Sequence, residues 1–249
     1  SRYSAMNKNS TIGIIGLGPR GETLLANLLA MTGEVEIVAV CDLQEARINK
    51  ILGILAKAGR TQPKAFSNYQ EMLALPELEG VLIPTSWNSH LQIARDAMAQ
   101  GKYAGIEVGG ATSLDELWQL VHAAEATGVS CMMLENCCYG RNELMALNLA
   151  RKGLFGELVH CSCGYEHDLA YMACEIENGF ERALHNLHRN CDLYPTHGLG
   201  PIAKILRINR GNRFISLTST ASKACGFAAA AEKNNWQGCA GHKVFNMGD

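Results

Sequence analysis

The sequence lacks the features that mark several large classes of protein. Lys and Arg total 22 against 24 Asp and Glu, and no basic run occurs, so the positive surface of a nucleic-acid-binding protein is missing. Apolar runs such as residues 129–134 are far shorter than the roughly 20 residues of a membrane-spanning helix. Residues 1–10 contain no apolar core of a secretory signal. We expect a cytoplasmic protein with no nucleic-acid or membrane partner, although an export signal removed ahead of Ser1 would leave this sequence unchanged.

The cysteine content does not predict disulfides. A chain of 249 residues can bury a sizeable core, so it does not need the disulfides of small secreted scaffolds. Most of the ten cysteines lie in apolar runs, as Cys41 does, where a free thiol behaves as a small apolar side chain. A zinc site from Cys137–Cys138 and Cys161-x-Cys163 is the alternative, but adjacent cysteines chelate poorly and no CxxC pair occurs. We predict reduced, mostly buried thiols and no metal site.

Short β-rich runs alternate with helical patterns up to about residue 135. Predicted strands cover residues 11–16, 35–41, the region of 65, 81–83, 103–108 and 129–134, and predicted helices cover 20–31, 43–58, 69–75, 89–100 and 114–127. Strands separated by helices in this way imply right-handed crossovers into one parallel sheet covered on both faces. We predict an α/β domain with a doubly wound parallel sheet over residues 8–135.

The pattern changes in the second half, residues 136–249. We predict helices at 139–151, 175–190 and 196–206, the last containing Pro201, and strands at 158–165 and 215–219. Two strands form a marginal sheet unless something covers their apolar face. The prediction is therefore a second, α+β domain whose sheet is incomplete.

A GxGxxG motif, Gly16 to Gly21, lies between the first strand and the first helix. Gly16 allows the tight turn, Gly18 lets a pyrophosphate approach the backbone, and Gly21 permits close packing of helix on strand. Asp42 ends the second strand, where its carboxylate would accept hydrogen bonds from ribose hydroxyls and repel a 2′-phosphate. Leu43 rather than Arg follows it. The first domain is thus predicted to be a Rossmann domain that binds NAD rather than NADP.

Ligands of such sheets lie beyond the carboxyl ends of the strands, which here lead into residues 84–90, 107–110 and 135–139. The order of the GxGxxG motif, Asp42, these residues and Glu107 resembles the Gfo/Idh/MocA oxidoreductase superfamily. Many dehydrogenases of that superfamily have Glu-Lys-Pro where this chain has Glu107-Val108-Gly109. Because a valine cannot relay a proton, the resemblance to an ordinary sugar dehydrogenase is weakened at this position.

Four further motifs resemble glycoside hydrolase family 109, the NAD-dependent α-N-acetylgalactosaminidases. They are residues 132–141, 164–168, 193–201 and 208–213, and the resemblance runs from about Ile12 to Ser222. Members of that family continue past the last residue of this chain, so the resemblance implies a second domain truncated relative to the family. It also implies a homo-oligomer, because an open sheet face often mediates dimers in the superfamily.

The resemblance implies a mechanism and a set of site residues. NAD takes a hydride from C3 of the sugar, a base removes the C2 proton, the C1 group leaves, water adds, and the hydride returns, with no net redox change. The implied catalytic residues are Glu135, Tyr165 and His197, of which Tyr165 and His197 move protons in an order left open. The implied substrate-binding residues are Tyr165, Arg182, Tyr194 and His197. The implied cofactor-binding residues are Gly16, Gly18, Arg20, Gly21, Asp42, Trp87, Asn88, Ser89, His90, Glu107, Val108, Asn136 and Tyr194.

Each single catalytic residue also has a purely structural interpretation. Glu135 and His197 would cap helices, and Tyr165 would be a strand residue with its hydroxyl at the surface. Three hypotheses follow for the whole protein. It hydrolyses glycans that end in α-linked N-acetylgalactosamine, it is an NAD-dependent sugar oxidoreductase, or it is a non-catalytic NAD-binding relative.

Overall fold

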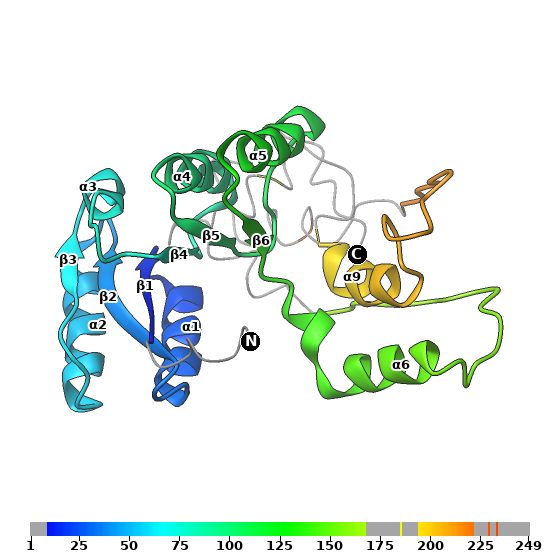
Figure 1. Ribbon diagram of the computed structural model, residues 1–249, viewed down its shortest axis with the longest axis horizontal. Helices are drawn as coiled ribbons and strands as arrows, with labels where there is room; N and C mark the ends of the chain where they lie inside the picture. Colours follow the sequence, from blue (N-terminus) through cyan, green and yellow to red (C-terminus); the bar gives the residue numbers. More distant parts are fainter. Residues whose placement is uncertain (1–8, 168–184, 186–193, 222–228, 230–232, 234–249) are drawn as a thin grey trace, which may run out of the picture. The chain divides into compact units, whose positions relative to one another are not determined.

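The computed structural model describes residues 9–167, 185, 194–221, 229 and 233 (Figure 1). Contacts between residues divide the chain into two compact units, Ser1–Leu134 and Glu135–Asp249. Within the described residues, no helix combines the length and the apolarity that crossing a bilayer requires.

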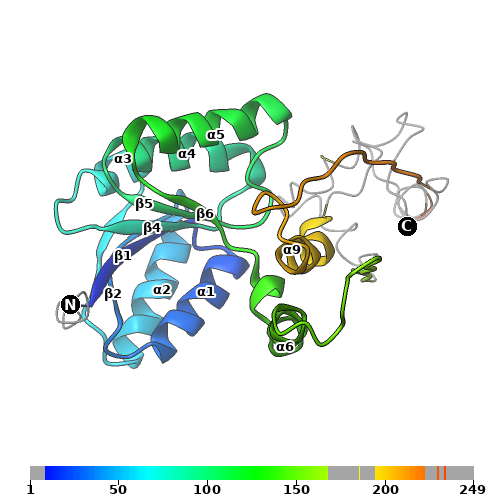
Figure 2. The ribbon, with the colours of Figure 1, turned by 45° about the vertical axis from the view of Figure 1, so that its right-hand side comes forward.

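The first unit is a six-stranded parallel sheet with helices on both faces, as predicted. Its strands are β1 (Ser10–Ile15), β2 (Val35–Cys41), β3 (Lys64–Phe66), β4 (Gly80–Ile83), β5 (Tyr103–Ile106) and β6 (Cys131–Met133), in the spatial order β3-β2-β1-β4-β5-β6. Its helices are α1 (Pro19–Ala30), α2 (Glu45–Lys57), α3 (Tyr69–Leu73), α4 (Trp87–Ala99) and α5 (Leu114–Thr127). Figure 2 shows α1 and α2 on one face of the sheet and α3, α4 and α5 on the other.

Alternation along the strands explains why both faces are buried. Successive side chains of a strand point to opposite faces of the sheet. In β1, the side chains on each face pack against a layer of helices. Ile14 packs with Leu25 and Ile51 of α1 and α2, whereas Ile15 packs in the cluster that contains Met98 of α4. Nearly continuous apolar strands of this kind are typical of a parallel sheet covered on both sides.

Local signals set the ends of α5. Ser113 accepts a hydrogen bond from the backbone N–H of Glu116, and the Glu116 side chain accepts from the backbone of Ser113, which completes a capping box. Gly128 adopts the left-handed conformation, with φ of 69°, and ends the helix. The predicted bounds of this helix are therefore confirmed.

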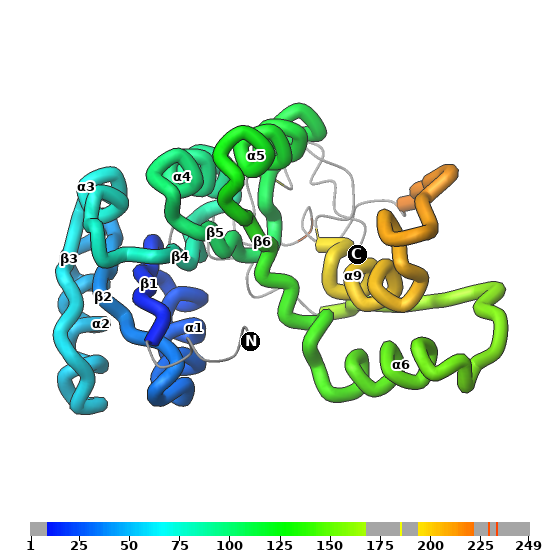
Figure 3. The backbone as a smooth tube through the Cα atoms, viewed as in Figure 1, coloured from blue at the N-terminus to red at the C-terminus, as the bar shows by residue number. Residues whose placement is uncertain are grey.

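The described part of the second unit is helical, and both of its predicted strands are wrong. A 3-10 helix η1 (Asn136–Tyr139) precedes α6 (Arg141–Arg151), and α9 (Thr196–Ile205) follows later. Residues 158–165 and 215–219 form neither helix nor strand, and Val159 and Ile215 are 91% and 92% exposed. An apolar β pattern becomes a strand only when a neighbour pairs with its backbone, and the described residues of this unit supply none. Figure 3 follows the chain from α6 through this irregular stretch. The predicted helix at 175–190 lies, apart from residue 185, outside the described residues.

The described cysteines are all free thiols: Cys41, Cys131, Cys137, Cys138, Cys161 and Cys163. Cys41 and Cys138 are buried, three are partly exposed and Cys163 is exposed. Burial is therefore less general among these six thiols than predicted.

Cys41 will resist alkylation in the folded protein. Burial, reinforced by the neighbouring charges of Asp42 and Glu71, raises the pKa of Cys41 to about 12, so the reactive thiolate is not populated. We expect iodoacetamide to label the exposed Cys163 in the native protein, while Cys41 stays unlabelled until the chain is unfolded. Peptide mapping by mass spectrometry measures both sites in one sample. Equal labelling of the two cysteines in the native protein would contradict the burial of Cys41.

Candidate functional site

The glycine turn after β1 is closed by backbone contacts that leave no room for side chains. Gly16 has a φ of 101°, and its N–H donates to the carbonyl of Cys41 at 2.8 Å. A Cβ on Gly21 would lie 2.2 Å from the Gly16 carbonyl oxygen, so α1 packs directly on the turn. These two glycines have the roles that the motif predicts for a tight turn and for close helix packing.

Gly18 faces open space, in contrast to Gly16 and Gly21. It is the N-cap of α1, no side chain caps the helix, and Pro19 occupies the first helical position. A Cβ on Gly18 would meet only the guanidinium of Arg47, at 3.7 Å. The start of α1 therefore presents backbone N–H groups and the positive end of the helix dipole to a ligand, as a pyrophosphate requires.

Asp42 supports this turn and keeps acceptor capacity. Its Oδ2 accepts the N–H of Leu17 at 2.7 Å, and its Oδ1 accepts the N–H of Gln44 at 2.8 Å. An ionised carboxylate has about four lone-pair sites, so two backbone bonds leave room for ribose hydroxyls. The residues at this edge fit NAD.

Arg47 is a neighbour of this site that the motif did not reveal. Its Nη1 lies 3.6 Å from Asp42 Oδ2 and close to Gly18, so a guanidinium stands between the acidic residue and the glycine turn. Leu43, which directly follows Asp42, carries no charge and gives no sign of this guanidinium. The helical spacing of Gln44 to Arg47 at the start of α2 could have identified it.

Arg20, in the first turn of α1, pairs with Glu107, which directly follows β5. Arg20 Nε donates to Glu107 Oε1 at 2.7 Å, and the N–H of Val108 donates to Glu107 Oε2 at 3.1 Å. Glu107 is buried, while 41% of the Arg20 side chain is exposed. The remaining guanidinium N–H groups of Arg20 are therefore available to an anion.

His90 connects the loops that follow β4 and β5. Its Nε2 lies 2.9 Å from the carbonyl oxygen of Thr85 and its Nδ1 lies 2.9 Å from that of Gly109. Its side chain is fully buried, and burial lowers the pKa of His90, against the opposing effects of the two carbonyls and of Glu107. Trp87 packs on the same loop, since a Cβ on Gly109 would lie 2.5 Å from the indole nitrogen. His90 thus holds the two loops together.

The predicted cofactor residues of the first unit gather at one edge of the sheet. The strand order reverses between β1 and β4, and ligands of such sheets bind outside the carboxyl ends at that point. The residues brought together are Gly16, Gly18, Arg20, Gly21, Asp42, Trp87, Ser89, His90, Glu107 and Val108, with Asn88 exposed beside them. Asn136 and Tyr194, also predicted to contact the cofactor, belong to the second unit.

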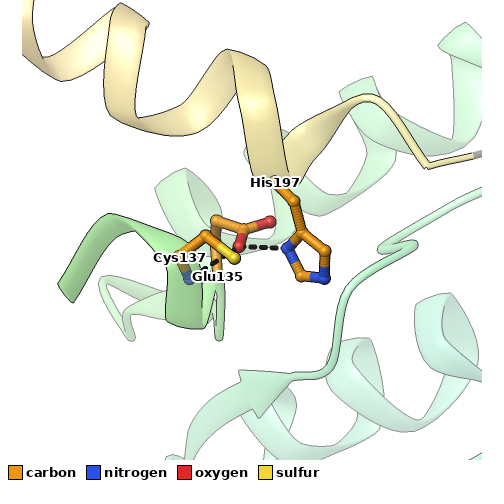
Figure 4. A group of neighbouring side chains, drawn as sticks. All are labelled: Glu135, Cys137 and His197. Atoms are coloured by element: carbon orange, nitrogen blue, oxygen red, sulfur yellow. Dashed lines mark hydrogen bonds and ion pairs between the residues drawn. The ribbon is translucent and has the colours of Figure 1, made fainter. Parts of the chain in front are cut away.

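In the second unit, Glu135 and His197 form a buried pair (Figure 4). His197 Nδ1 lies 2.5 Å from Glu135 Oε1, and the two side chains are 8% and 5% exposed. Glu135 is also the N-cap of η1, where its carboxylate accepts the N–H of Cys137 at 3.0 Å. The capping role and the pairing with His197 therefore coexist in one carboxylate.

The contact with Glu135 selects the state of the His197 ring. In the neutral ring, a carboxylate that accepts the Nδ1 proton leaves the lone pair on Nε2, where it can accept a proton from a ligand. Pro201 lies inside α9, four residues after His197, and cannot donate an N–H to the His197 carbonyl. The pair combines a buried, oriented imidazole with an accepting nitrogen, which is the arrangement of a general base.

Two aromatic rings lie against His197. The Tyr165 and Tyr194 rings stand edge-on to the imidazole, with centroids 4.5 Å and 4.6 Å away, and their own centroids are 5.8 Å apart. Tyr165 is 45% exposed, so a ligand can reach it. The structure thus brings together four predicted residues of the second unit, Glu135, Tyr165, Tyr194 and His197. Arg182 lies outside the described residues.

Two glycines of α9 will respond differently to alanine. A Cβ on Gly200 would lie 2.8 Å from Cys138 Sγ and 3.1 Å from Glu135 Cγ, both on buried residues, whereas a Cβ on Gly198 would meet the exposed Cys163. In a helix interior, alanine raises the free energy of unfolding by about 1 kcal/mol relative to glycine, but overpacking lowers it by about 1–3 kcal/mol. We expect Gly200→Ala to be the less stable variant by about 1–3 kcal/mol, measured by denaturant unfolding. Equal stability of the two variants would contradict the packing at Gly200.

Comparison with known families gives a match in each half of the chain. The model of the oxidoreductase family described as "NAD-binding Rossmann fold" matches residues 10–135. The model of the C-terminal domain of glycosyl hydrolase 109 matches residues 139–249.

Curated relatives match most of this chain but only half of their own length. An "Alpha-N-acetylgalactosaminidase" of Shewanella oneidensis is 40% identical over 228 residues, which are 89% of this chain and 50% of the relative. A "Glycosyl hydrolase family 109 protein" of Solibacter usitatus is 42% identical over 223 residues, which are 87% of this chain and 51% of the relative. The chain spans about half the length of the curated relatives it matches.

Solved structures share the fold. Scyllo-inositol dehydrogenase from Lactobacillus casei, with bound NAD(H) and scyllo-inositol, has a TM-score of 0.61 and 15% identity over 80% of this chain and 56% of that chain. The WlbA dehydrogenase from Bordetella pertussis, in complex with NADH and UDP-GlcNAcA, has a TM-score of 0.53 and 19% identity over 60% of this chain and 44% of that chain.

Proposed function

Because the chain belongs to the Gfo/Idh/MocA oxidoreductase family, and matches glycosyl hydrolase family 109 within it, we propose that this protein is an NAD-dependent glycosidase. Its substrate is a glycan that ends in α-linked N-acetylgalactosamine, the sugar in the name of its Shewanella oneidensis relative. The observation that carries the proposal is the buried pair of Glu135 and His197, with two tyrosine rings packed against the imidazole.

The edge of the first sheet holds the cofactor. The open backbone at Gly18 and the start of α1 bind the pyrophosphate, Arg20 adds a positive charge, and Asp42 receives the ribose hydroxyls. A bound NAD⁺ would supply a hydride acceptor for C3 of the sugar, and return of the hydride at the end of the cycle would leave no net redox change.

The second unit supplies the proton transfers. The Nε2 atom of His197 and the hydroxyl of Tyr165 serve the C2 proton and the C3 hydroxyl proton of the sugar. Glu135 is a positioning residue, because its carboxylate holds the Nδ1 proton and keeps Nε2 available as an acceptor. Val108, 3% exposed, has no proton to exchange, which favours a glycosidase over a sugar dehydrogenase that uses a lysine at this position.

One assay separates the proposed function from its alternatives. The purified chain is incubated with an aryl α-N-acetylgalactosaminide, first without and then with added NAD⁺, while aglycone release and NADH absorbance are followed together. We expect aglycone release without accumulation of NADH, and no release from the β-linked isomer. Accumulation of NADH with free N-acetylgalactosamine would instead identify a sugar oxidoreductase. Absence of both signals, in a protein that binds NAD⁺, would identify a non-catalytic relative.

A further inference from the structure

Two side chains with metal-binding atoms lie beside the carboxylate of Glu135. Glu135, Cys137 and His197 each offer one ligand atom, and these atoms lie within 4.8 Å of one another. Figure 4 shows the cluster, with Glu135 and Cys137 at the start of η1 and His197 in the first turn of α9. Glu135 and His197 are 62 residues apart along the chain. No short sequence motif therefore predicts the cluster.

One atom of this cluster lacks a partner. Glu135 is 4% exposed, and among the described residues its Oε2 accepts no hydrogen bond. Its other oxygen, Oε1, already accepts a hydrogen bond from the N–H of Cys137 and contacts the imidazole of His197. Buried polar atoms are nearly always satisfied, and a charged oxygen left without a partner is costly. The unpaired Oε2 therefore points to a ligand that carries positive charge.

The chemistry of the three groups selects the kind of cation. A thiolate, an imidazole and a carboxylate are the ligands of zinc sites, whereas Mg²⁺ and Ca²⁺ prefer oxygen ligands alone. Cys137 is partly exposed, so a cation from solvent can reach the cluster. Three protein ligands also leave the fourth position of a tetrahedral ion open.

We propose that Glu135, Cys137 and His197 bind a thiophilic divalent cation of the Zn²⁺ class. The thiol of Cys137 loses its proton to solvent as the Sγ–metal bond forms. The imidazole exchanges its Nδ1 proton for one on Nε2, so that the Nδ1 lone pair binds the metal and the ring stays neutral. Glu135 contributes Oε2, the oxygen without a partner, and its Oε1 gives up the contact with the imidazole proton.

The consequence for activity rests on the proposed function. With Nε2 protonated and Nδ1 bound to metal, His197 has no lone pair left to accept a substrate proton. The cation would therefore act as an inhibitor of the glycosidase and not as its cofactor, and a chelator would restore activity.

Metal titration of the full chain tests the site without any substrate. The reduced, chelator-treated protein is titrated with Zn²⁺ against a chromophoric chelator, and separately with Co²⁺, whose thiolate complexes absorb in the near ultraviolet. We expect the wild-type chain to bind one more equivalent of Zn²⁺ than Cys137→Ser, and the Co²⁺–thiolate band to weaken in the same variant. His197→Ala should lose the same equivalent. Cys163→Ser, which removes an exposed thiol of the same unit, is the matched control and should retain it.

The outcomes are distinguishable from those of the activity assay. Unchanged Zn²⁺ stoichiometry and unchanged Co²⁺ absorption in Cys137→Ser would overturn the metal site, whatever the activity. If Cys137→Ser loses one equivalent of Zn²⁺ and the wild-type chain cleaves no glycoside, the metal site is supported. Only the proposed function is then contradicted. Zn²⁺ that binds at this site without slowing an active enzyme would overturn the inhibitory role.

Discussion

Replacing His197 with alanine is expected to lower the rate of glycoside cleavage by about 10²–10⁴-fold, the usual contribution of a general acid or base. The substitution removes the nitrogen that accepts the proton and leaves the Glu135 carboxylate without its partner. NAD⁺ binding should persist, because the glycine turn and Asp42 belong to the first unit. Initial rates with an aryl α-N-acetylgalactosaminide measure the first effect, and calorimetric titration with NAD⁺ measures the second.

Two further variants separate chemistry from folding. His160→Ala removes an exposed histidine of the same unit and should leave the rate unchanged. Glu135→Gln keeps the shape of the side chain, but an amide can either accept a proton from His197 Nδ1 or donate one to it, so the ring is no longer held in one state with Nε2 as the acceptor. We expect a rate between those of His197→Ala and the wild type. A His197→Ala protein with wild-type activity would remove this residue from the mechanism.

The fold of the first unit could be predicted from the sequence because its signals are local. Each signal lies within a few residues. Residues 35–41 and 114–127 form a strand and a helix with the predicted bounds, since an apolar β-branched run and a capping box are properties of the segment itself. The GxGxxG motif is equally local as a signal, because its three glycines lie within six residues, although the turn that it forms also contacts Cys41 and Thr85. Order along the chain then suffices to place these residues at one edge of a parallel sheet.

Features that depend on distant partners could not be predicted in the same way. The apolar residues around Val159 and Ile215 read as strands, yet strand formation depends on a pairing partner that no local pattern reveals. The ion pair of Arg20 with Glu107 and the place of Cys137 beside His197 are contacts between segments far apart in the sequence. The family resemblance named Arg20, Glu107 and His197 individually, but not the pairs that they form.

Alanine at Gly18 and at Gly21 should impair NAD⁺ binding for two different physical reasons. At Gly21 the new Cβ would lie 2.2 Å from the Gly16 carbonyl oxygen, so the turn or the helix must move, and both stability and binding fall. At Gly18 the backbone has a φ of −69°, which alanine adopts readily, and the nearest atom to the new Cβ is 3.7 Å away. The Gly18→Ala protein should therefore fold normally and still lose NAD⁺ affinity by at least about tenfold, or about 1.4 kcal/mol, because its methyl group occupies the space of the pyrophosphate.

Thermal unfolding and calorimetric titration with NAD⁺ together distinguish these two effects. Gly53→Ala is the matched control: a Cβ there meets no atom within 4 Å, and an alanine inside α2 should raise stability slightly without changing affinity. Wild-type NAD⁺ affinity in Gly18→Ala would mean that the cofactor does not approach the backbone at this turn. Since the helix start at Gly18 is the feature that distinguishes a phosphate-binding turn from an ordinary glycine-rich one, that result would separate the Rossmann fold of this chain from dinucleotide binding.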